Sequence, residues 1–507
     1  MVINAMVKTY LESRLRRIQT AAERAPEVQQ QVWTELLTQG KDTAFGTEHR
    51  FERIRNYEDF NLRVPIRSYE ALFPYIERTM RGEKDVLWPG TVRWFAKSSG
   101  TTNDRSKFIP VTKESLEECH YKGGRDVLSI YTKHYPDHQL FEGKSLVLTG
   151  SVHQDEATQA QTGDVSAVLI ENMPFWIHFF RTPSREIAFL PNWEEKLSKL
   201  VEATIREDVT FLSGIPSWML SVLQKALEIT GHNDIRSVWP NLQLFIHGAV
   251  RFDPYRPHYK RIIPHEDMHY LETYNASEGF FGIQDLKQPG EMLLMTDYGV
   301  FYEFIPTSEL HLEKPKAIPL EEVDVGVNYA MVISTNGGLW RYIIGDTLKF
   351  SSIAPFRFHI TGRTKHFINA FGEELMVDNA EMALAEACKQ TGAVLTEYTA
   401  APLFFDQDGT GCHEWVIEFS KPPENPKAFA QIFDSSLKAL NSDYEAKRKG
   451  DLTLKFPRLY LAPEGTFYSW MKQRGKTGGQ NKVPRLSNDR QYIDSISLLC
   501  PCEPVTL

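Results

Sequence analysis

Cysteine is scarce in this chain and long hydrophobic runs are absent, and each shortage excludes a class of protein. The 507 residues include five cysteines, scattered over positions 119, 388, 412, 500 and 502. An odd, scattered set does not form a disulfide framework, and the CPC at 500–502 lacks the CxxC spacing of a redox or zinc pair. No stretch approaches the roughly 18 apolar residues of a membrane span, and the first residues lack the apolar run of a signal peptide. We therefore predict a cytoplasmic protein without a membrane partner.

Excess positive charge is missing as well. The formal net charge is −9, and the short basic clusters at 14–17 and 447–449 are flanked by acidic residues. This balance gives no general attraction to nucleic acids or anionic membranes, so we predict no nucleic-acid partner. Apolar residues, by contrast, are plentiful. They make up 42% of the chain, which is enough for two or three domains with large cores.

Strand-like and helix-like segments alternate through the first half of the chain. Residues 5–37 have helical spacing that is interrupted near Pro26, which predicts two helices. From about residue 92 the segments VRWFA, SLVLTG, VTFLSGIP and LQLFIHG have strand character, and the stretches between them have helical periodicity. This alternation is typical of an α/β fold with a mostly parallel sheet.

The pattern changes near residue 288. Closely spaced β-like runs follow, among them YAMVIST, LWRYIIGD and FRFHITG, and they predict an antiparallel subdomain. The last block begins with the helix-like NAEMALAEACKQT, continues with strands around WVIEFS and a helix around AQIFDSSLKALNSDYEAKR, and ends in a loop rich in Gly, Lys and Arg. We place a domain boundary at 363–366.

The segment KSSGTTNDRSK at 97–107 follows the strand-like VRWFA, and α/β proteins bind ligands beyond strand ends. Gly100 lets the backbone approach a ligand closely, the hydroxyl groups add donors, and Lys107 adds a positive charge. A polyphosphate needs these features. The same composition also fits a plain Ser/Thr-rich turn, and the segment does not match the GxxxxGK[ST] pattern of a Walker A loop.

Three further motifs indicate other chemistries, but their surroundings do not support them. Gly475-Lys476-Thr477 resembles the end of a Walker A loop, yet Trp470 stands where the first glycine is needed. The HExxH spacing at 265–269 is preceded by Pro264 and followed by the β-rich YLETY, so a surface loop is favoured over a zinc site. The NASEG at 275–279 lacks the first glycine of a nucleophile elbow, which disfavours a serine hydrolase.

Five polar clusters follow one another at predicted strand ends: SSGTT at 98–102, HGAV at 247–250, YNASEG at 274–279, YIIGD at 342–346 and GRTKHFINAFGEEL at 362–375. With these clusters in this order, and with QNKVPR at 480–485, the chain resembles the acyl-adenylate-forming enzymes. It resembles most closely the auxin-responsive acyl acid–amido synthetases, a family that also has bacterial members. The resemblance covers essentially the whole chain.

The resemblance implies an α/β fold in two parts. A large N-terminal domain at 1–363 would bind ATP and the acyl substrate, with mostly parallel sheets and a β-rich subdomain. A small, mobile α+β domain at 364–507 would carry the catalytic lysine. The residues implied for binding ATP or AMP are Ser98, Ser99, Gly100, Thr101, Thr102, Lys107, Gly248, Ala249, Tyr274, Asn275, Ala276, Ser277, Asp346 and Arg363.

Further roles follow from the same resemblance. Tyr274 would stack on adenine, and Asp346 would accept hydrogen bonds from the ribose. Glu278 would hold Mg²⁺, which takes oxygen ligands from one or two carboxylates and from phosphate. Lys482 would be catalytic, drawing the acyl carboxylate and the α-phosphate together, and Lys365 would be the hinge about which the small domain rotates.

The implied enzyme is an ATP-dependent, AMP-forming acid–amino acid ligase, with ATP and Mg²⁺ as cofactors and a monomer favoured. Its partners would be a small carboxylic acid and an amino acid. Two alternatives stay open: a ligase that passes the acyl group to coenzyme A, and a non-catalytic nucleotide-binding protein of the same fold. Four residues are candidates for the acyl pocket, although each fits an ordinary core equally well: Trp218, Met219, Tyr298 and Phe301.

Overall fold

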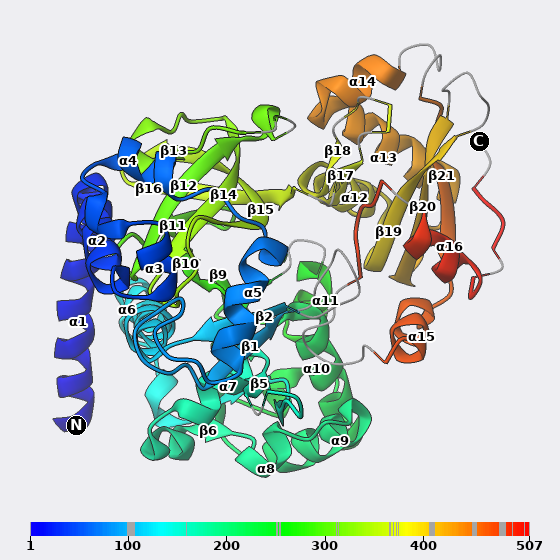
Figure 1. Cartoon of the computed structure of the whole chain (residues 1–507). Coiled ribbons are helices and arrows are strands. Elements are labelled where there is room, and N and C mark those ends of the chain that lie inside the picture. Colours follow the sequence, from blue (N-terminus) through cyan, green and yellow to red (C-terminus); the bar gives the residue numbers. More distant parts are fainter. Residues whose placement is uncertain are drawn as a thin grey trace. The chain divides into compact units, whose positions relative to one another are not determined.

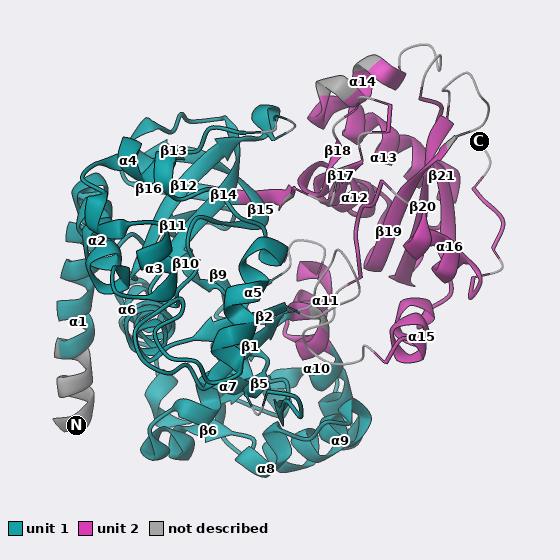
Figure 2. Cartoon of the chain, in the orientation of Figure 1, with its two compact units in different colours: residues 1–215, 221–249, 265–359 teal, residues 216–220, 250–264, 360–507 magenta. Residues whose placement is uncertain are grey.

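The fold was determined as a computed structural model, and Figure 1 follows the chain through its helices and strands. The structure describes residues 2–505 except 99–106, 159, 250–251, 253–254, 311, 313, 365–366, 369, 372, 374, 405–410, 449–453, 476–482, 489 and 501. The chain divides into two compact units, coloured separately in Figure 2. Unit 1 comprises residues 1–215, 221–249 and 265–359, and unit 2 comprises 216–220, 250–264 and 360–507.

Unit 1 is built on one long mixed sheet. Among the described residues this sheet has twelve strands. The five strands at one side of the sheet, in the spatial order β6, β3, β7, β8 and β9, pair in parallel. In the rest of the sheet, from β9 to β13 in space, each strand pair whose register is described is antiparallel. The predicted parallel part and antiparallel part are both present, but they form two halves of one sheet and not a sheet with a separate subdomain. In spatial order the strands are β13 (Ile318–Pro319), β12 (Val300–Pro306), β14 (Asn328–Thr335), β15 (Tyr342–Ile353), β16 (Phe356–Arg363), β11 (Met292–Leu294), β10 (Gly279–Ile283), β9 (His269–Ala276), β8 (Leu244–Gly248), β7 (Val209–Gly214), β3 (Lys144–Val147) and β6 (Arg181–Thr182).

A second, four-stranded sheet in unit 1 carries the segment that flanks the predicted phosphate loop. Its order is β2 (Lys107–Val111), β1 (Trp94–Ser98), β5 (Gln161–Gly163) and β4 (Val152–Gln154). β1 and β2 are antiparallel neighbours, and Ser98 pairs with Lys107. The two ends of the predicted loop are thus held side by side by the strand pairing.

The helices of unit 1 follow the periodicity of the sequence. The first two meet at Arg24, close to the predicted break, and Pro26 lies in the first turn of α2, where a missing N–H costs little. One segment departs from the ordinary α-helix, since Ser115–His120 forms a π-helical turn, η2, directly before α6. The helices are α1 (Val2–Glu23), α2 (Ala25–Gly40), α3 (Ala44–Glu48), α4 (Tyr57–Arg63), α5 (Tyr69–Met80), α6 (Tyr121–His134), α7 (Val165–Asn172), α8 (Arg185–Ala188) and α9 (Trp193–Thr204), and α10 (Pro216–Thr230) has residues in both units.

Unit 2 is a small α+β structure with its own core. In its three-stranded sheet β20 (Gly411–Lys421) pairs antiparallel with β19 (Val394–Phe404) and parallel with β21 (Arg458–Ala462). Its core includes side chains of α12 and α13 packed with the buried Trp415 of β20. The remaining elements are α11 (Arg256–Ile262), β17 (Phe367–Ile368), β18 (Leu375–Met376), α12 (Val377–Thr391), α13 (Pro426–Leu440), α14 (Ser442–Arg448), α15 (Thr466–Gln473) and α16 (Gln491–Ser497).

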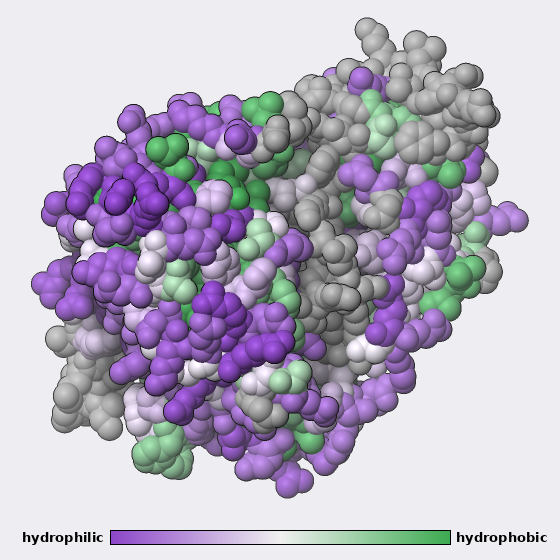
Figure 3. All heavy atoms as spheres, viewed as in Figure 1, coloured by the Kyte–Doolittle hydropathy of each residue, from purple (hydrophilic) through white to green (hydrophobic). Residues whose placement is uncertain are grey.

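The surface of the chain is mixed. The face drawn in Figure 3 is largely hydrophilic, with separate hydrophobic patches. Within the described part of the chain, no helix has the length and apolar character needed to cross a membrane.

Candidate functional site

The parallel strands of unit 1 bring two predicted motifs together at one edge of the sheet. β8 ends at Gly248, which pairs with Thr273 of β9. A Cβ at Gly248 would lie 2.4 Å from the carbonyl oxygen of Thr273, so only glycine fits there. The next residue, Ala249, is exposed and has a φ of +71°, a left-handed conformation that non-glycine residues seldom adopt. At Ala249 the backbone therefore bends at the end of β8, beside the start of the YNASEG motif.

The motifs YNASEG and YIIGD make two reciprocal contacts. Each contains a tyrosine and, four positions later, a carboxylate. The Tyr274 hydroxyl donates to Oδ2 of Asp346, and the Tyr342 hydroxyl lies 3.5 Å from Oε1 of Glu278, at the long limit of a hydrogen bond. The tyrosine of each motif thus contacts the carboxylate of the other.

These contacts define the shape of the site. β9 and β15 are separated by three strands in the sheet, which is roughly 19 Å in a flat sheet with strands about 4.8 Å apart. Side chains that touch across this interval require the sheet to curl, so that β15 faces the end of β9. Tyr274 lies on β9, whereas Glu278 lies in the turn between β9 and β10, so β15 contacts both the strand and the turn that follows it.

Lys107 extends the same cluster toward the predicted phosphate loop. Its Nζ donates to the Tyr342 hydroxyl at 3.2 Å, and it lies 5.7 and 5.8 Å from the ring centroids of Tyr69 and Tyr342. Burial raises the pKa of Tyr69 to about 12, with smaller contributions from the negative charges of Glu70 and Glu278. A cation, two tyrosines and a carboxylate therefore lie together next to the two ends of the loop.

Tyr274 and Asp346 are both buried. Tyr274 is 6% exposed, and its ring makes edge contacts with Phe281 and Phe358, whose centroids lie 4.9 and 6.2 Å away. Its hydroxyl group orients the carboxylate of Asp346, which is 8% exposed. Burial, ring contacts and this hydrogen bond define the positions of both side chains, as expected for a preformed binding site.

The polar residues between Tyr274 and Glu278 are held as well. Asn275 Oδ1 lies 3.0 Å from Nδ1 of His120, and Ser277 is buried. Burial lowers the pKa of His120 to about 4, and the hydrogen bond with Asn275 opposes this shift in part. The imidazole is therefore neutral near pH 7.

His120 makes the stability of the protein sensitive to acid. An imidazole in an unfolded chain titrates near pH 6.5, so the depressed pKa in the folded state contributes stability above that pH, which is lost as the pH falls toward 4. We expect this residue to account for a loss of about 3 kcal/mol over that range. Denaturant titrations of the wild type and His120→Gln at several pH values measure it. The two curves should differ in slope between pH 6.5 and 4, whereas the exposed His232→Gln control should follow the wild type, and identical slopes for His120→Gln would contradict the assignment.

Several predicted residues lie outside the described part of the chain. These are Ser99, Gly100, Thr101 and Thr102 of the phosphate loop, the hinge residue Lys365 and the catalytic residue Lys482. Arg363 ends β16, and the structure describes only its backbone. The assignments of these residues remain predictions.

Of the four acyl-pocket candidates, Tyr298 and Phe301 belong to unit 1, and Trp218 and Met219 belong to unit 2. Tyr298 is fully buried in unit 1, where its hydroxyl donates to Oδ2 of Asp126 at 2.7 Å, and Asp126 also accepts two hydrogen bonds from Arg14. Phe301 packs among aromatic rings of the same core, with the centroids of Trp33, Tyr57 and Phe60 between 6.2 and 6.4 Å away. These contacts explain Tyr298 and Phe301 as core residues. Trp218 and Met219 lie in the first turn of α10, and Met219 is fully buried.

The HExxH segment is not presented on a helix. His269 begins β9, and its Nδ1 lies 2.9 Å from the Tyr131 hydroxyl, while His265 precedes the strand and lies 3.7 Å from Asp234. Among the described residues no group of three or more His, Cys, Asp or Glu side chains is placed to bind a metal ion. Glu278 as a single carboxylate still suits Mg²⁺ that arrives with ATP, because phosphate oxygens and water supply the other ligands.

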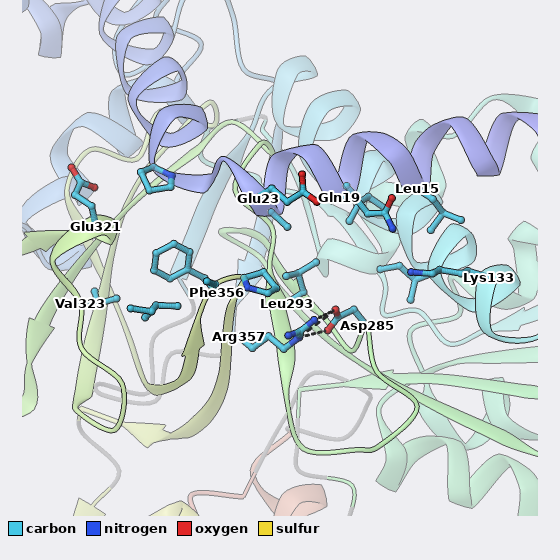
Figure 4. Close-up of a pocket in the computed structure, with 17 residues that line it drawn as sticks. Leu15, Gln19, Glu23, Lys133, Asp285, Leu293, Glu321, Val323, Phe356 and Arg357 are labelled. Carbon is cyan, nitrogen blue, oxygen red and sulfur yellow. Dashed lines mark hydrogen bonds and ion pairs between the residues drawn. The ribbon is translucent and has the colours of Figure 1, made fainter.

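A cavity of about 640 Å³ lies elsewhere in unit 1, lined by residues of α1, α6 and the β11, β15 and β16 region. None of the predicted site residues lines it. Figure 4 shows Arg357 and Asp285 facing each other there, and their closest atoms, Nη2 and Oδ2, are 2.7 Å apart.

Sequence reasoning missed Tyr342, Tyr69 and His120. Tyr342 is the first residue of a quoted motif, and its spacing from Asp346 equals the spacing between Tyr274 and Glu278. That repeated spacing was a readable signal. Tyr69 and His120 belong to segments with ordinary helical patterns, so their contacts with the site depend on the tertiary structure alone.

The fold is that of solved adenylate-forming enzymes. It is similar to a GH3.15 acyl acid amido synthetase, with a TM-score of 0.79 and 17% sequence identity over 98% of this chain and 97% of the other. It is also similar to 2-hydroxyisobutyryl-CoA ligase in the postadenylation state in complex with 2-HIB-AMP, with a TM-score of 0.60 and 11% identity over 94% and 92% of the two chains. The two similarities confirm the predicted mixed α/β fold with a large N-terminal and a smaller C-terminal part.

Family models match the chain in three successive segments. They are the GH3 family N-terminal domain over residues 14–268, the central domain over 293–363 and the C-terminal domain over 378–491. The chain belongs to the GH3 family. Among its relatives are indole-3-acetic acid-amido synthetase GH3.3 of Arabidopsis thaliana, 23% identical over 93% of this chain and 91% of the relative, and GH3.8 of Oryza sativa subsp. indica, 25% identical over 93% and 90%.

Proposed function

We propose that this chain is an ATP-dependent acyl acid–amido synthetase, which adenylates a small carboxylic acid and transfers the acyl group to the amine of an amino acid. The observation that supports it best is the reciprocal contact of YNASEG and YIIGD, with Lys107 beside it. Membership of the GH3 family and the names of its relatives point to the same reaction.

In the first half-reaction, a carboxylate oxygen attacks the α-phosphorus of ATP and the bond to the β-phosphate oxygen breaks, which releases pyrophosphate. Lys107 and the loop from Ser98 bind the phosphates, Asp346 binds the ribose, and Lys482 holds the two anionic reactants together. Glu278 would hold Mg²⁺, which when bound neutralises charge on the phosphates. The Tyr342 hydroxyl bridges Lys107 and Glu278 and so fixes the distance between them.

In the second half-reaction, the amine nitrogen attacks the activated carbonyl, the new C–N bond forms and AMP leaves. We propose that the smaller domain rotates about Lys365 between the two steps, so that one cavity serves both. The product is an amide of the acid with the amino acid.

The experiment that tests this function is a screen for pyrophosphate release over carboxylic acids, with mixed amino acids as acceptors. We expect release that depends on one class of acid and a product whose mass equals acid plus amino acid minus water. Absence of acid-dependent release with every acid would contradict the proposal.

An acyl-CoA-type ligase is the second candidate, and the fold similarity to 2-hydroxyisobutyryl-CoA ligase favours it. Both candidates release pyrophosphate, so the screen alone does not separate them. Mass analysis of the products, with amino acids and coenzyme A supplied in turn, separates the two candidates. A thioester formed in place of an amide would establish the second candidate.

Tyr342→Phe tests the bridge between Lys107 and Glu278. The variant keeps the ring but removes the hydroxyl that receives the hydrogen bond from Lys107. Hydrogen bonds to charged groups contribute about 1.5–3 kcal/mol, so we expect kcat/KM for ATP to fall by about 10- to 100-fold. Tyr329→Phe on β14, whose hydroxyl accepts a hydrogen bond from the Asp324 backbone, is the matched control and should retain the wild-type value. Equal kinetics for the two variants would remove Tyr342 from the site.

A further inference from the structure

The π-helical turn η2 contacts the β9–β10 hairpin on both sides of Glu278. Nδ1 of His120 lies 3.0 Å from Oδ1 of Asn275, three residues before Glu278. Sγ of Cys119 accepts a hydrogen bond from the backbone N–H of Phe280 at 3.2 Å, two residues after Glu278. Two consecutive side chains of one turn therefore contact the hairpin on both sides of Glu278 in the sequence.

The packing around these contacts leaves the hairpin little freedom. A Cβ at Gly123, near the start of α6, would lie 2.5 Å from the Phe280 ring, so the ring rests directly on the helix backbone. A Cβ at Gly279 would lie 2.8 Å from the Phe281 ring. Each position requires glycine because an aromatic ring lies too close for a Cβ, and both positions lie within a few residues of the η2 contacts.

The turn η2 is itself anchored. Thr112 Oγ1 accepts a hydrogen bond from the Ser115 N–H at 3.0 Å and donates to the carbonyl oxygen of Asn336 at 2.7 Å. His120 is 4% exposed, and its neutral ring donates from Nδ1 to the carbonyl oxygen of the Asn275 side chain. π-helical turns are less stable than α-helical ones and are found often at functional sites, where they redirect side chains. Here the turn directs Cys119 and His120 toward the same hairpin.

We propose that His120 and Cys119 are positioning residues that fix the Glu278 turn in the place where its carboxylate meets the magnesium ion of Mg·ATP. The inference rests on the proposed function, because it takes Glu278 as the magnesium ligand. Mg²⁺ demands nearly ideal octahedral geometry at short distances, so a small displacement of the carboxylate weakens binding. Partners that orient a metal ligand typically contribute 10- to 100-fold to metal affinity.

The test is the binding of ATP by titration calorimetry with and without Mg²⁺, which needs no turnover. For His120→Ala we expect the gain in ATP affinity caused by Mg²⁺ to fall about tenfold, with affinity in the absence of Mg²⁺ unchanged. His120→Gln keeps a donor and should restore most of the gain. His269→Ala is the matched control, because His269 lies at the opposite end of β9, is hydrogen-bonded to Tyr131 and is stacked on Tyr135. It should leave the effect of Mg²⁺ unchanged.

A double-mutant cycle separates positioning from general destabilisation. If His120 acts through Glu278, then His120→Ala adds no further loss in a Glu278→Ala background. Cys119→Ala should cause a smaller loss in the same direction, and it serves as the second variant if His120→Ala does not fold. This inference alone would be overturned if His120→Ala and Cys119→Ala kept the wild-type gain in ATP affinity caused by Mg²⁺ while Glu278→Ala lost it. Absence of Mg²⁺-dependent ATP binding in the wild type would overturn the proposed function with it.

Discussion

Glu278→Ala should lower acid-dependent ATP–pyrophosphate exchange by at least about 100-fold. The carboxylate is half-buried at the turn between β9 and β10, and the Tyr342 hydroxyl that contacts it also binds Lys107. Without it, a magnesium ion bound to the phosphates loses its protein ligand and the nucleotide loses its orientation. The loss should diminish as the Mg²⁺ concentration rises, because excess metal partly compensates for weak binding.

Glu266→Ala is the control for this variant. Glu266 is exposed in the segment just before β9, so its removal takes away a carboxylate close by in sequence without touching the site. Exchange in this control should match the wild type. Glu278→Ala with full exchange at every Mg²⁺ concentration would remove Glu278 from the reaction.

Lys482→Ala should reduce formation of the acyl-adenylate by about 1,000-fold while ATP binding stays near the wild-type value. The lysine is proposed to draw the acyl carboxylate and the α-phosphate together, an effect realised in the transition state of the first step. Transfer from a chemically prepared acyl-adenylate to an amino acid should therefore survive in the variant. Single-turnover measurements of the two half-reactions provide the comparison.

The matched control for Lys482→Ala is Lys427→Ala. Lys427 is exposed on α13 in the same unit, so its loss changes the charge of the unit without affecting the proposed site. Both half-reactions should proceed normally in it. If Lys482→Ala slowed acyl transfer as much as adenylation, the assignment of Lys482 to the first half-reaction alone would be wrong.

Periodicity carried most of the fold prediction. The alternation between residues 92 and 248 predicted the strands β1, β3, β7 and β8 and the helices between them, and the change of pattern near 288 marked the antiparallel half. Two features had no local signal. The two halves join into one sheet, and residues 216–220 and 250–264 belong to the same compact unit as the C-terminal part. Both depend on contacts between segments distant in sequence.

The candidate site was predicted in part. The motifs YNASEG and YIIGD were identified, and the structure places Tyr274 against Asp346. The contact between Tyr342 and Glu278 was not predicted, because it depends on the curl of the sheet between β9 and β15. Hydrophobic residues are the least predictable from sequence, since an aromatic side chain in a core and one in a pocket have the same local pattern, as Tyr298 illustrates.

The central claim is that the ends of β9 and β15 form one nucleotide site, with Asp346 for the ribose and Glu278 for the magnesium ion. Titration calorimetry of Asp346→Ala and Glu278→Ala with ATP, in the presence and absence of Mg²⁺, tests it most directly. The account predicts that Asp346→Ala weakens ATP binding in both conditions, whereas Glu278→Ala weakens it only when Mg²⁺ is present. Wild-type affinity of both variants in both conditions would contradict the account.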